Sequence, residues 1–390
     1  MPKHSKAETI AAAYGVVSDA NFRSVVPPIY LSSTFAFSAY GCGGRYEYSR
    51  SSNPSRDLLA EALAKLEGGA GAVITSSGMA AVDLILSLAR PGDLVLAPHD
   101  CYGGTYRLLS ARRNRGHFDV AFVDQGDVVA LTATLARGPK LVFVETPSNP
   151  LMRVVDIREI ALRAKAAGAK IAVDNTFLSP ALQQPIALGA DFVLHSTTKY
   201  INGHSDVVGG AVVAADPSDV AELMAWANIA GTIGAPFDAY MTLRGLRTLF
   251  PRIKLQQENA MSIARFLAQH PAVARVHYPG LATHPGHGLA ASQQKGFGAM
   301  LSFELRGGVD SVREFVGAVE VFTLAESLGG VESLVAHPAT MTHCDMGAEA
   351  RHIAGISDSL LRLSTGIEAE SDLIAGLERG LAAVERALKL

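Results

Sequence analysis

The segment around Lys199 carries the side chains with the clearest potential for chemistry. An apolar run, predicted as a strand over 192–195, ends at the hydroxyls of Ser196 and Thr198, and Lys199 follows directly. Such hydroxyls can bind a phosphate, and an amine in a partly desolvated cleft becomes nucleophilic toward a carbonyl. Because a lysine at a strand end is more often a solvated surface cation, a second signal is needed.

Asp174 gives that second signal. It comes directly after the apolar run Ile171–Val173, where ionised carboxylates are rare unless they are paired. An aspartate there can cap the next turn, but it can also keep a pyridine nitrogen protonated. A lysine and an aspartate at neighbouring strand ends are what a pyridoxal cofactor needs from a protein. Together, Lys199 and Asp174 predict pyridoxal 5′-phosphate.

Two further loops fit this prediction. Ser76-Ser-Gly-Met-Ala-Ala joins a strand to a helix, so the N–H groups of Gly78 and Met79 can face an anion. Tyr102 follows another predicted strand, where its ring could stack on a flat cofactor. Each feature also has a common structural use, as an ordinary turn and as a core tyrosine.

Two other kinds of site are disfavoured. Ser196-Thr-Thr-Lys199 matches the Ser-x-x-Lys motif of penicillin-interacting enzymes, but the Lys-Thr-Gly and Ser-Asp-Asn tripeptides and a Gly-x-Ser-x-Gly elbow are all absent from the sequence. His284-Pro-Gly-His287 lacks cysteine or carboxylate support and is typical of a surface turn. No metal site is predicted.

The elements that must position these residues alternate along the chain. Short apolar runs between amphipathic segments are typical of a parallel sheet covered by helices on both faces, which places chemistry in loops after the carboxyl ends of the strands. The sequence therefore predicts an α/β fold. The expected strands are 72–75, 94–97, 120–123, 141–145, 171–174, 192–195 and 207–213, and the expected helices are 79–88, 105–113, 127–135, 156–166 and 219–230.

The pattern changes after about residue 237. One long helix is expected from 237 to about 267. It is followed by the mixed pattern of a smaller α+β domain that closes with a helix over 371–388. Residues 1 to about 60 show little periodicity and indicate an arm. The expected strands of the smaller domain are 273–278, 299–304, 321–324 and 361–364.

Composition excludes several classes of protein. A net charge of −3 gives no basic surface for nucleic acid, and charged residues interrupt every apolar run before it could cross a membrane. Three widely spaced cysteines predict neither disulfides nor a zinc site. With no secretory signal in the N-terminal residues, the expected location is the cytoplasm.

The motifs, taken together and in order, resemble the Cys/Met-metabolism pyridoxal-phosphate enzymes, the trans-sulfuration family. The likeness covers nearly the whole chain. Within the family it is closest to bacterial enzymes of γ-replacement, through residues 98–104, 123–127, 177–183 and 295–305. The family motifs are Tyr48-Ser-Arg50, Asn53-Pro54, Ser77-Gly-Met79, Glu145-Thr-Pro-Ser-Asn-Pro150, Val173-Asp-Asn-Thr176, Ser196-Thr-Thr-Lys-Tyr200, Gly203-His-Ser-Asp206 and Leu324-Ala-Glu-Ser-Leu-Gly-Gly330.

The resemblance implies a fold-type I subunit, like that of aspartate aminotransferase, with a mainly parallel sheet in its large domain. We expect an N-terminal arm over 1–60 that contacts a neighbouring subunit, a cofactor-binding domain over 61–255 and a C-terminal α+β domain over 256–390. It also implies a homotetramer built as a dimer of dimers, acting on small amino-acid substrates, with no nucleic-acid or membrane partner.

The resemblance also assigns roles to residues. Lys199 would hold the cofactor covalently and act as the catalytic base, Asp174 would bind the pyridine nitrogen, and Tyr102 would stack on the ring and take part in proton transfer. The phosphate would be held by Gly78, Met79, Ser196 and Thr198, and by Tyr48 and Arg50 of the adjacent subunit. Arg362 would bind the substrate α-carboxylate beside Ser327 and Asn149, and Arg107, Glu326 and Glu47 would line the rest of the substrate pocket.

The activity implied is γ-replacement, in which O-succinyl-L-homoserine and L-cysteine give L-cystathionine and succinate. Glu47 and Glu326 leave γ-elimination of cystathionine to cysteine, 2-oxobutanoate and ammonia as the alternative, because γ-lyases also carry Glu at the first position and Glu326 fits both activities. A non-catalytic relative that keeps the fold for binding is disfavoured, since the lysine, aspartate, tyrosine and arginine are all present.

Overall fold

The computed structural model describes residues 5–389, which separate into two compact units. Unit 1 comprises the chain up to Arg90 together with Lys170–Phe250, and unit 2 comprises Pro91–Ala169 together with the chain from Pro251 onward. Both units are therefore built from segments that are discontinuous in sequence.

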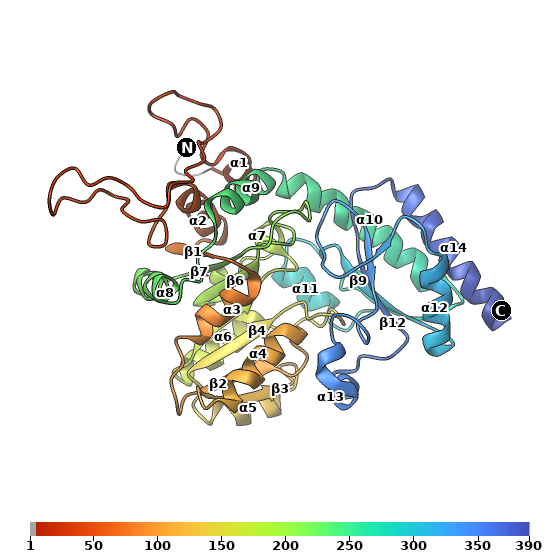
Figure 1. Ribbon diagram of the computed structural model, residues 1–390. Helices are drawn as coiled ribbons and strands as arrows, with labels where there is room; N and C mark the ends of the chain where they lie inside the picture. Colours follow the sequence, from red (N-terminus) through yellow and green to blue (C-terminus); the bar gives the residue numbers. More distant parts are fainter. Residues whose placement is uncertain (1–4, 390) are drawn as a thin grey trace. The chain divides into compact units, whose positions relative to one another are not determined.

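Unit 1 contains four neighbouring strands in the order β1-β7-β6-β5. Among them, Figure 1 labels β1, β7 and β6. β5 and β6 run parallel, whereas β7 is antiparallel to both β1 and β6. The strands are β1 (Gly71–Thr75), β5 (Lys170–Asp174), β6 (Phe192–Ser196) and β7 (Gly210–Ala214), and the helices are α1 (Ala7–Ala13), α2 (Pro54–Glu67), α3 (Gly78–Leu86), α7 (Ser179–Leu182), the 3-10 turn η1 (Pro185–Leu188), α8 (Pro217–Ala230) and α9 (Pro236–Leu246).

Unit 2 holds a parallel set of strands in the order β4-β2-β3 and a separate, smaller sheet in the order β10-β11-β12-β9-β8. Its first segment contains β2 (Leu94–Pro98), α4 (Gly103–Asn114), β3 (Asp119–Val123), α5 (Val128–Leu135), β4 (Leu141–Glu145) and α6 (Ile157–Ala166). The second contains most of α10 (Leu249–Gln269), then β8 (Val273–His277), α11 (His287–Gln293), β9 (Met300–Leu305), α12 (Gly308–Ala318), β10 (Thr323–Leu324), β11 (Leu334–Ala336), η2 (Cys344–Met346), α13 (Gly347–Ala354), β12 (Leu360–Ser364) and α14 (Glu370–Leu388).

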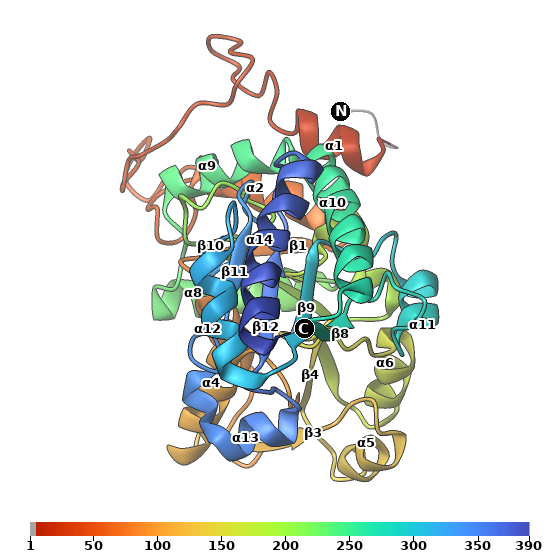
Figure 2. The same ribbon diagram turned by 90° about the vertical axis from the view of Figure 1, so that its right-hand side faces the viewer.

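The smaller sheet is covered by two helices that lie side by side, α12 and α14 (Figure 2). The apolar stripe of α14 buries Leu373, Leu377 and Leu381, which recur at the spacing of one helix face. Phe315 of α12 is fully buried and contacts Phe303 of β9 edge-on, with ring centroids 5.5 Å apart. Burial of this apolar face fixes the sheet that carries β12.

The α/β prediction is confirmed, and the predicted strands and most predicted helices match to within a few residues. The long helix expected from 237 to 267 is instead two helices, α9 and α10. Pro251 lies in the first turn of α10, and because proline has no N–H to donate to the carbonyl four residues earlier, one helix cannot continue through it.

The expectation of little regular structure before residue 60 was also incomplete. That segment contains α1 and the first half of α2. α2 starts where Asn53 accepts hydrogen bonds from the N–H groups of Ser55 and Arg56, with Pro54 at its first position. Among the helices of residues 5–389, none combines the length and apolar character that a bilayer crossing requires.

Candidate active site

Lys199 and Asp174 lie at the same edge of the unit 1 sheet. β5 and β6 are hydrogen-bonded parallel neighbours with Asp174 opposite Leu194, so both strands end on the same side. Lys199 follows β6 in a turn in which its N–H donates to the carbonyl of Ser196 (3.2 Å) and its own carbonyl accepts from the N–H of Gly203 (2.7 Å). The structure thus brings together the two strand ends on which the cofactor prediction depends.

The Asp174 carboxylate lies in a site suited to a cation. Its Oδ1 accepts a hydrogen bond from the N–H of Thr176 (2.9 Å). Burial raises the pKa of Asp174, while hydrogen bonds from Thr176 and the charge of His195 act in the opposite direction. A positive charge against this carboxyl would favour its ionised form, so the site fits a protonated pyridine nitrogen.

The N-terminus of α3 lies against Ser196. The hydroxyl of Ser77 caps the helix by accepting from the N–H of Ala80 (3.0 Å). A Cβ atom on Gly78 would lie only 2.7 Å from the Cβ and 2.9 Å from the Oγ of Ser196, so only glycine lets the backbone approach this closely. The N–H groups that open α3 and the Ser196 hydroxyl therefore form a donor set suited to a phosphate.

The second predicted hydroxyl already has backbone partners. Thr198 Oγ1 donates to the carbonyl of Gly209 (3.2 Å) and accepts from the N–H of Gly209 (3.0 Å). These bonds fix the turn that carries Lys199 to the segment entering β7. A phosphate bound by Thr198 would have to compete with the Gly209 carbonyl for the hydroxyl proton.

The predicted arm residues lie together on the surface of unit 1. Arg50 Nη1 donates to the carbonyl (2.7 Å) and the Oδ1 (3.0 Å) of Asn228 on α8, and the guanidinium lies 5.7 Å from the ring centroid of Tyr48. Tyr48 is about half exposed, and the side chain of Glu47 is exposed. The contact with Asn228 fixes this part of the arm to α8.

Sequence reasoning missed a buried polar cluster beneath the β5 and β6 strand ends. Nε2 of His195 lies 2.7 Å from Oε1 of Glu67, and both side chains are fully buried. Asn175 Nδ2 donates to the same Glu67 oxygen (2.8 Å), and Gln183 Nε2 donates to Asn175 Oδ1 (3.1 Å). His195 stands inside an apolar strand directly before Ser196, and a histidine in that position was the available signal.

Arg362, Asn149 and Ser327 meet in unit 2 as predicted. Arg362 is on β12 between β11 and β9 and is only 2% exposed, so it is not an ordinary surface arginine at a strand edge. Its guanidinium donates to Asn149 Oδ1 (3.0 Å) and to the carbonyl of Ser327 (2.9 Å). Ser327 has φ of 89°, a strained conformation for a residue other than glycine.

Tyr102 shares an electrostatic environment with three other predicted residues. It occupies the N-cap position of α4 and is 39% exposed. Burial raises the pKa of its phenol, the charge of Glu326 raises it further, and the charges of Arg107 and Arg362 lower it. The phenol therefore keeps its proton at neutral pH in this environment. The residues of unit 2 that are predicted to bind the substrate therefore lie close enough to Tyr102 for their charges to shift its pKa.

Two residues that position this region were not singled out from the sequence. Glu145 ends β4 and accepts from the N–H groups of Tyr102 (2.8 Å) and Asn149 (2.9 Å). His343 is buried, with Nε2 donating to the carbonyl of Asn149 (3.0 Å). Burial first, and then the charge of Arg362, lowers the pKa of His343 to about 4. Glu145 carries the same signal as Asp174, a carboxylate directly after an apolar strand.

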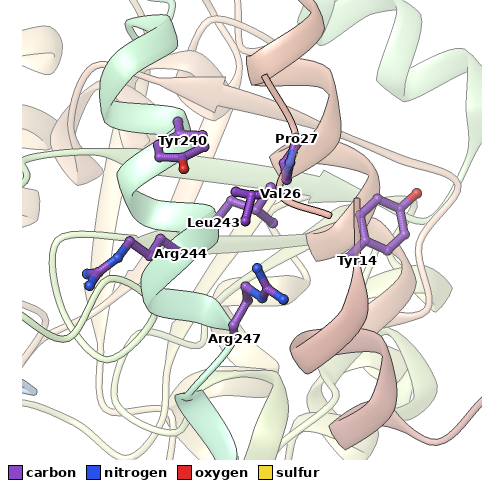
Figure 3. A pocket seen from close by; sticks show the side chains of 7 residues that line it. All are labelled: Tyr14, Val26, Pro27, Tyr240, Leu243, Arg244 and Arg247. Atoms are coloured by element: carbon purple, nitrogen blue, oxygen red, sulfur yellow. The ribbon is translucent and has the colours of Figure 1, made fainter. Parts of the chain in front are cut away.

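A pocket of about 130 Å³ in unit 1 contains none of the predicted site residues. Figure 3 shows it between α9 and the N-terminal segment, with Arg244 and Arg247 on the α9 side. Arg247 Nε donates to the carbonyl of Ala12 near the end of α1 (2.9 Å), which gives this arginine a structural use. The lining residues are Tyr14, Val26, Pro27, Tyr240, Leu243, Arg244 and Arg247.

The model of one protein family, described as Cys/Met metabolism PLP-dependent enzyme, matches residues 8–382. The chain is 57% identical over 382 residues to cystathionine γ-synthase of Escherichia coli K12, which covers 98% of this chain and 99% of the relative.

Solved structures agree with this sequence similarity. Cystathionine γ-synthase of Xanthomonas oryzae in complex with aminoacrylate and cysteine is similar with a TM-score of 0.97 and 58% identity, covering 98% of this chain and 99% of that chain. Cystathionine γ-lyase of Lactobacillus plantarum, complexed with L-serine, is similar with a TM-score of 0.94 and 40% identity, covering 98% of this chain and 100% of that chain.

Proposed function

The chain belongs to the Cys/Met metabolism PLP-dependent enzyme family, and from this premise we propose that it catalyses γ-replacement. O-succinyl-L-homoserine and L-cysteine would give L-cystathionine and succinate. The observation that carries the proposal is the 57% identity, over 98% of the chain, to a cystathionine γ-synthase. The higher identity to a γ-synthase structure than to a γ-lyase structure, 58% against 40%, supports the same choice.

The enzyme uses pyridoxal 5′-phosphate. When bound, this group withdraws electrons from the substrate carbons next to the amino group and so makes their protons acidic. Asp174 would hold the ring nitrogen and Lys199 the aldehyde carbon. Gly78 and Met79, with the hydroxyl of Ser196, would supply donors to the phosphate, and Thr198 would join them by turning its hydroxyl proton from the Gly209 carbonyl to the anion.

Lys199 would move the protons of the reaction. Once the substrate amine has displaced it from the aldehyde carbon, the Lys199 amine would take the proton from Cα, give this proton up to the bound cofactor, and then take a proton from Cβ, so that the γ-ester can leave as succinate. The cysteine thiolate would form the new bond at Cγ, and Lys199 would return the proton to Cβ as the product forms. One base serving two adjacent carbons needs a long, flexible side chain, which lysine provides.

Arg362 would bind the substrate α-carboxylate. It is already oriented by Asn149 and by the Ser327 carbonyl, so its planar guanidinium is prepared for a bidentate pair. Tyr102 would stack on the cofactor ring and exchange a proton with the incoming cysteine. Because its surroundings raise the phenol pKa, positive charge from the substrate ammonium would be needed for it to act as a base.

The remaining roles concern the rest of the pocket and the assembly. Arg107, Glu326 and Glu47 would line the distal part of the substrate site. Tyr48 and Arg50 would complete the phosphate site of an adjacent subunit in a homotetramer built as a dimer of dimers, working in the cytoplasm. The functional division would be an arm over 1–60, a cofactor domain over 61–255 and a C-terminal domain over 256–390.

An assay with two sets of substrates tests the proposal. The purified protein, loaded with pyridoxal 5′-phosphate, is given O-succinyl-L-homoserine with L-cysteine in one reaction and L-cystathionine alone in the other. We expect the larger kcat/KM in the first reaction, with cystathionine and succinate formed in equal amounts. A larger value in the second, with 2-oxobutanoate and ammonia formed, would make the protein a γ-lyase. A purified protein that stays colourless would instead indicate a non-catalytic relative.

A further inference from the structure

Glu145 connects two loops that carry different parts of the candidate site in unit 2. It is the last residue of β4, and only 8% of its surface is exposed. Oε2 accepts from the N–H of Tyr102, in the loop after β2, at 2.8 Å. Oε1 accepts from the N–H of Asn149, in the loop after β4, at 2.9 Å. A single buried side chain therefore fixes the backbone at both places.

Asn149 in turn orients Arg362. Its Oδ1 accepts from the guanidinium at 3.0 Å, and its carbonyl accepts from His343 Nε2 at 3.0 Å. Displacement of the Asn149 backbone would move the acceptor that holds the Arg362 guanidinium. The position of Arg362 thus depends on the bond between Glu145 and the Asn149 N–H.

Tyr102 depends on the other oxygen of Glu145. The tyrosine is at the N-cap of α4, where no side chain caps the helix. The following residue, Gly103, lies so close to the chain that a Cβ atom would be 2.8 Å from the carbonyl of Thr342. Glu145 therefore holds the Tyr102 backbone directly before a tightly packed turn, which fixes the position from which the Tyr102 side chain extends.

A carboxylate is the side chain that suits these two donors. Both of its oxygens accept hydrogen bonds and neither donates, so it satisfies two N–H groups at once. A glutamine has the same shape but turns an NH₂ group toward one of the two N–H groups. Hydrogen bonds to an ionised acceptor are also stronger than those to a neutral one.

We propose that Glu145 is a positioning residue that couples the placement of Tyr102 to that of Arg362 through Asn149. The part that this coupling plays in catalysis rests on the proposed function. In that function Tyr102 would stack on the cofactor ring and exchange a proton with the incoming cysteine, and Arg362 would bind the substrate α-carboxylate. Because both carboxylate oxygens of Glu145 accept from backbone N–H groups, the residue would act by setting the distance between Tyr102 and Arg362.

The first test uses hydrogen exchange in the protein without cofactor. Glu145→Ala removes both acceptors and Glu145→Gln removes one. We expect exchange at Tyr102 and Asn149 to be faster by about 10-fold or more in Glu145→Ala, and faster for at least one of the two in Glu145→Gln. The matched control is Gln125→Leu, which removes a buried hydrogen bond of 2.7 Å to the Phe143 carbonyl on the same strand, and should leave both amides unchanged. Wild-type exchange at both amides in Glu145→Ala would contradict the proposal.

The second test measures coupling in the protein loaded with cofactor. L-Norvaline has the α-amino and α-carboxylate groups of the substrate but no leaving group, and its binding is followed by the absorbance of the bound cofactor. We expect Glu145→Gln to raise the Kd about 10-fold and to lower kcat/KM on the order of 10²-fold, because a misplacement of about 1 Å costs that much. Gln125→Leu should leave the Kd unchanged.

A double-mutant cycle decides between coupling and simple destabilisation. If Glu145 acts through Arg362, the Kd increase of the double variant Glu145→Gln/Arg362→Lys will be smaller than the product of the two single increases. A double variant whose increase equals the product would overturn the proposal. This cycle also remains informative if Glu145→Ala does not fold.

The tests separate the inference from the proposed reaction. If the wild-type protein makes no cystathionine but the exchange and norvaline results follow expectation, the proposed function fails while the coupling stands. If cystathionine is made and Glu145→Gln binds norvaline like the wild type, the coupling fails and the proposed function stands.

Discussion

Gly78 and Ser196 are in such close contact that a Cβ atom on the glycine would lie 2.7 Å from the Cβ of the serine. The Ser196 atoms nearest to this position are its Cβ, Oγ and Cα. Because they belong to the backbone or to a short side chain, they have little room to move away. Because α3 and β6 approach so closely at this point, the N–H groups that open α3 and the Ser196 hydroxyl together form the donor set proposed for the phosphate.

Gly78→Ala should therefore weaken cofactor binding. Overpacking costs about 1–3 kcal/mol, and pushing α3 away from Ser196 should lower the affinity for pyridoxal 5′-phosphate about 10- to 100-fold. The measurement is a titration of the cofactor-free protein followed by absorbance. Gly317→Ala is the control, because a Cβ there meets no atom within 4 Å, and it should leave the affinity unchanged. Wild-type affinity in Gly78→Ala would exclude the proposed phosphate site.

Lys199→Ala should remove both turnover and the absorbance band of covalently held cofactor. The reason is that no other amine would be available at this strand end to bond to the aldehyde carbon. Borohydride treatment followed by mass spectrometry should find the cofactor on the Lys199 peptide of the wild type and not on this peptide in the variant. Lys254→Ala, exposed on α10, should behave like the wild type. A variant that kept band and turnover would refute the assignment of Lys199.

Asp174→Asn should lower activity while stabilising the cofactor-free protein at neutral pH. Because burial raises the folded-state pKa of Asp174, the unfolded chain ionises first as the pH rises above about 4, and stability falls until the pH passes the folded-state pKa. Asparagine does not ionise, so the Asp174→Asn variant does not lose folding stability in this way as the pH rises. We expect kcat to fall at least about 10²-fold, since the amide cannot hold the ring nitrogen protonated.

Denaturant unfolding of the cofactor-free wild type and variant, from pH 4 to pH 8, checks the stability part. The advantage of Asp174→Asn should grow with pH. A constant difference would mean that the Asp174 pKa is the same in the folded and unfolded chains.

Arg362→Lys should raise KM for the amino-acid substrate and leave the fold intact. The ammonium can replace the charge but cannot bond to Asn149, to the Ser327 carbonyl and to a carboxylate in one plane. We expect kcat/KM to fall on the order of 10²-fold. Arg379→Lys is the control, because this exposed residue pairs with Glu320 at the surface and such pairs contribute little. Equal kcat/KM in both variants would remove Arg362 from substrate binding.

His343→Gln should reduce the loss of stability in acid. The folded-state pKa of about 4 is below the ordinary value of 6.5, so between these pH values the unfolded chain binds a proton that the folded chain does not. Stability contributed by neutral His343 is present above pH 6.5 and is lost as the pH falls toward 4, by about 3 kcal/mol at most. Unfolding measured from pH 7 to pH 4 should show a smaller decline in the variant than in His352→Gln, whose side chain is exposed.

Local patterns in the sequence predicted the fold and some residues of the candidate site. Apolar runs reveal a strand because each strand must bury its own side chains, and a polar residue placed directly after such a run reveals its end. Lys199 and Asp174 were predicted in this way, and β5 and β6 place them at one edge. Arg362 was predicted only through resemblance to a family, because nothing in its own strand distinguishes it.

What the sequence could not reveal is which distant residues meet. Asn149 and Arg362 are 213 residues apart and meet through one hydrogen bond, and no local period records such a pairing. The same holds for Glu67 and His195, which are 128 residues apart. Glu145 had the correct local signal, but its role follows only from the two N–H groups that the folded chain brings to it.

The antiparallel pairing of β1 with β7 has a consequence for synthesis of the chain. β1 ends at residue 75 and β7 begins at residue 210, so 134 residues separate the two strands. At a synthesis rate of about 5–20 residues per second, on the order of 10 s pass between the synthesis of β1 and that of β7. During that interval the backbone N–H and C=O groups that will pair with β7 are open to pairing with other chains, which makes β1 a site of aggregation until residue 214 has been made.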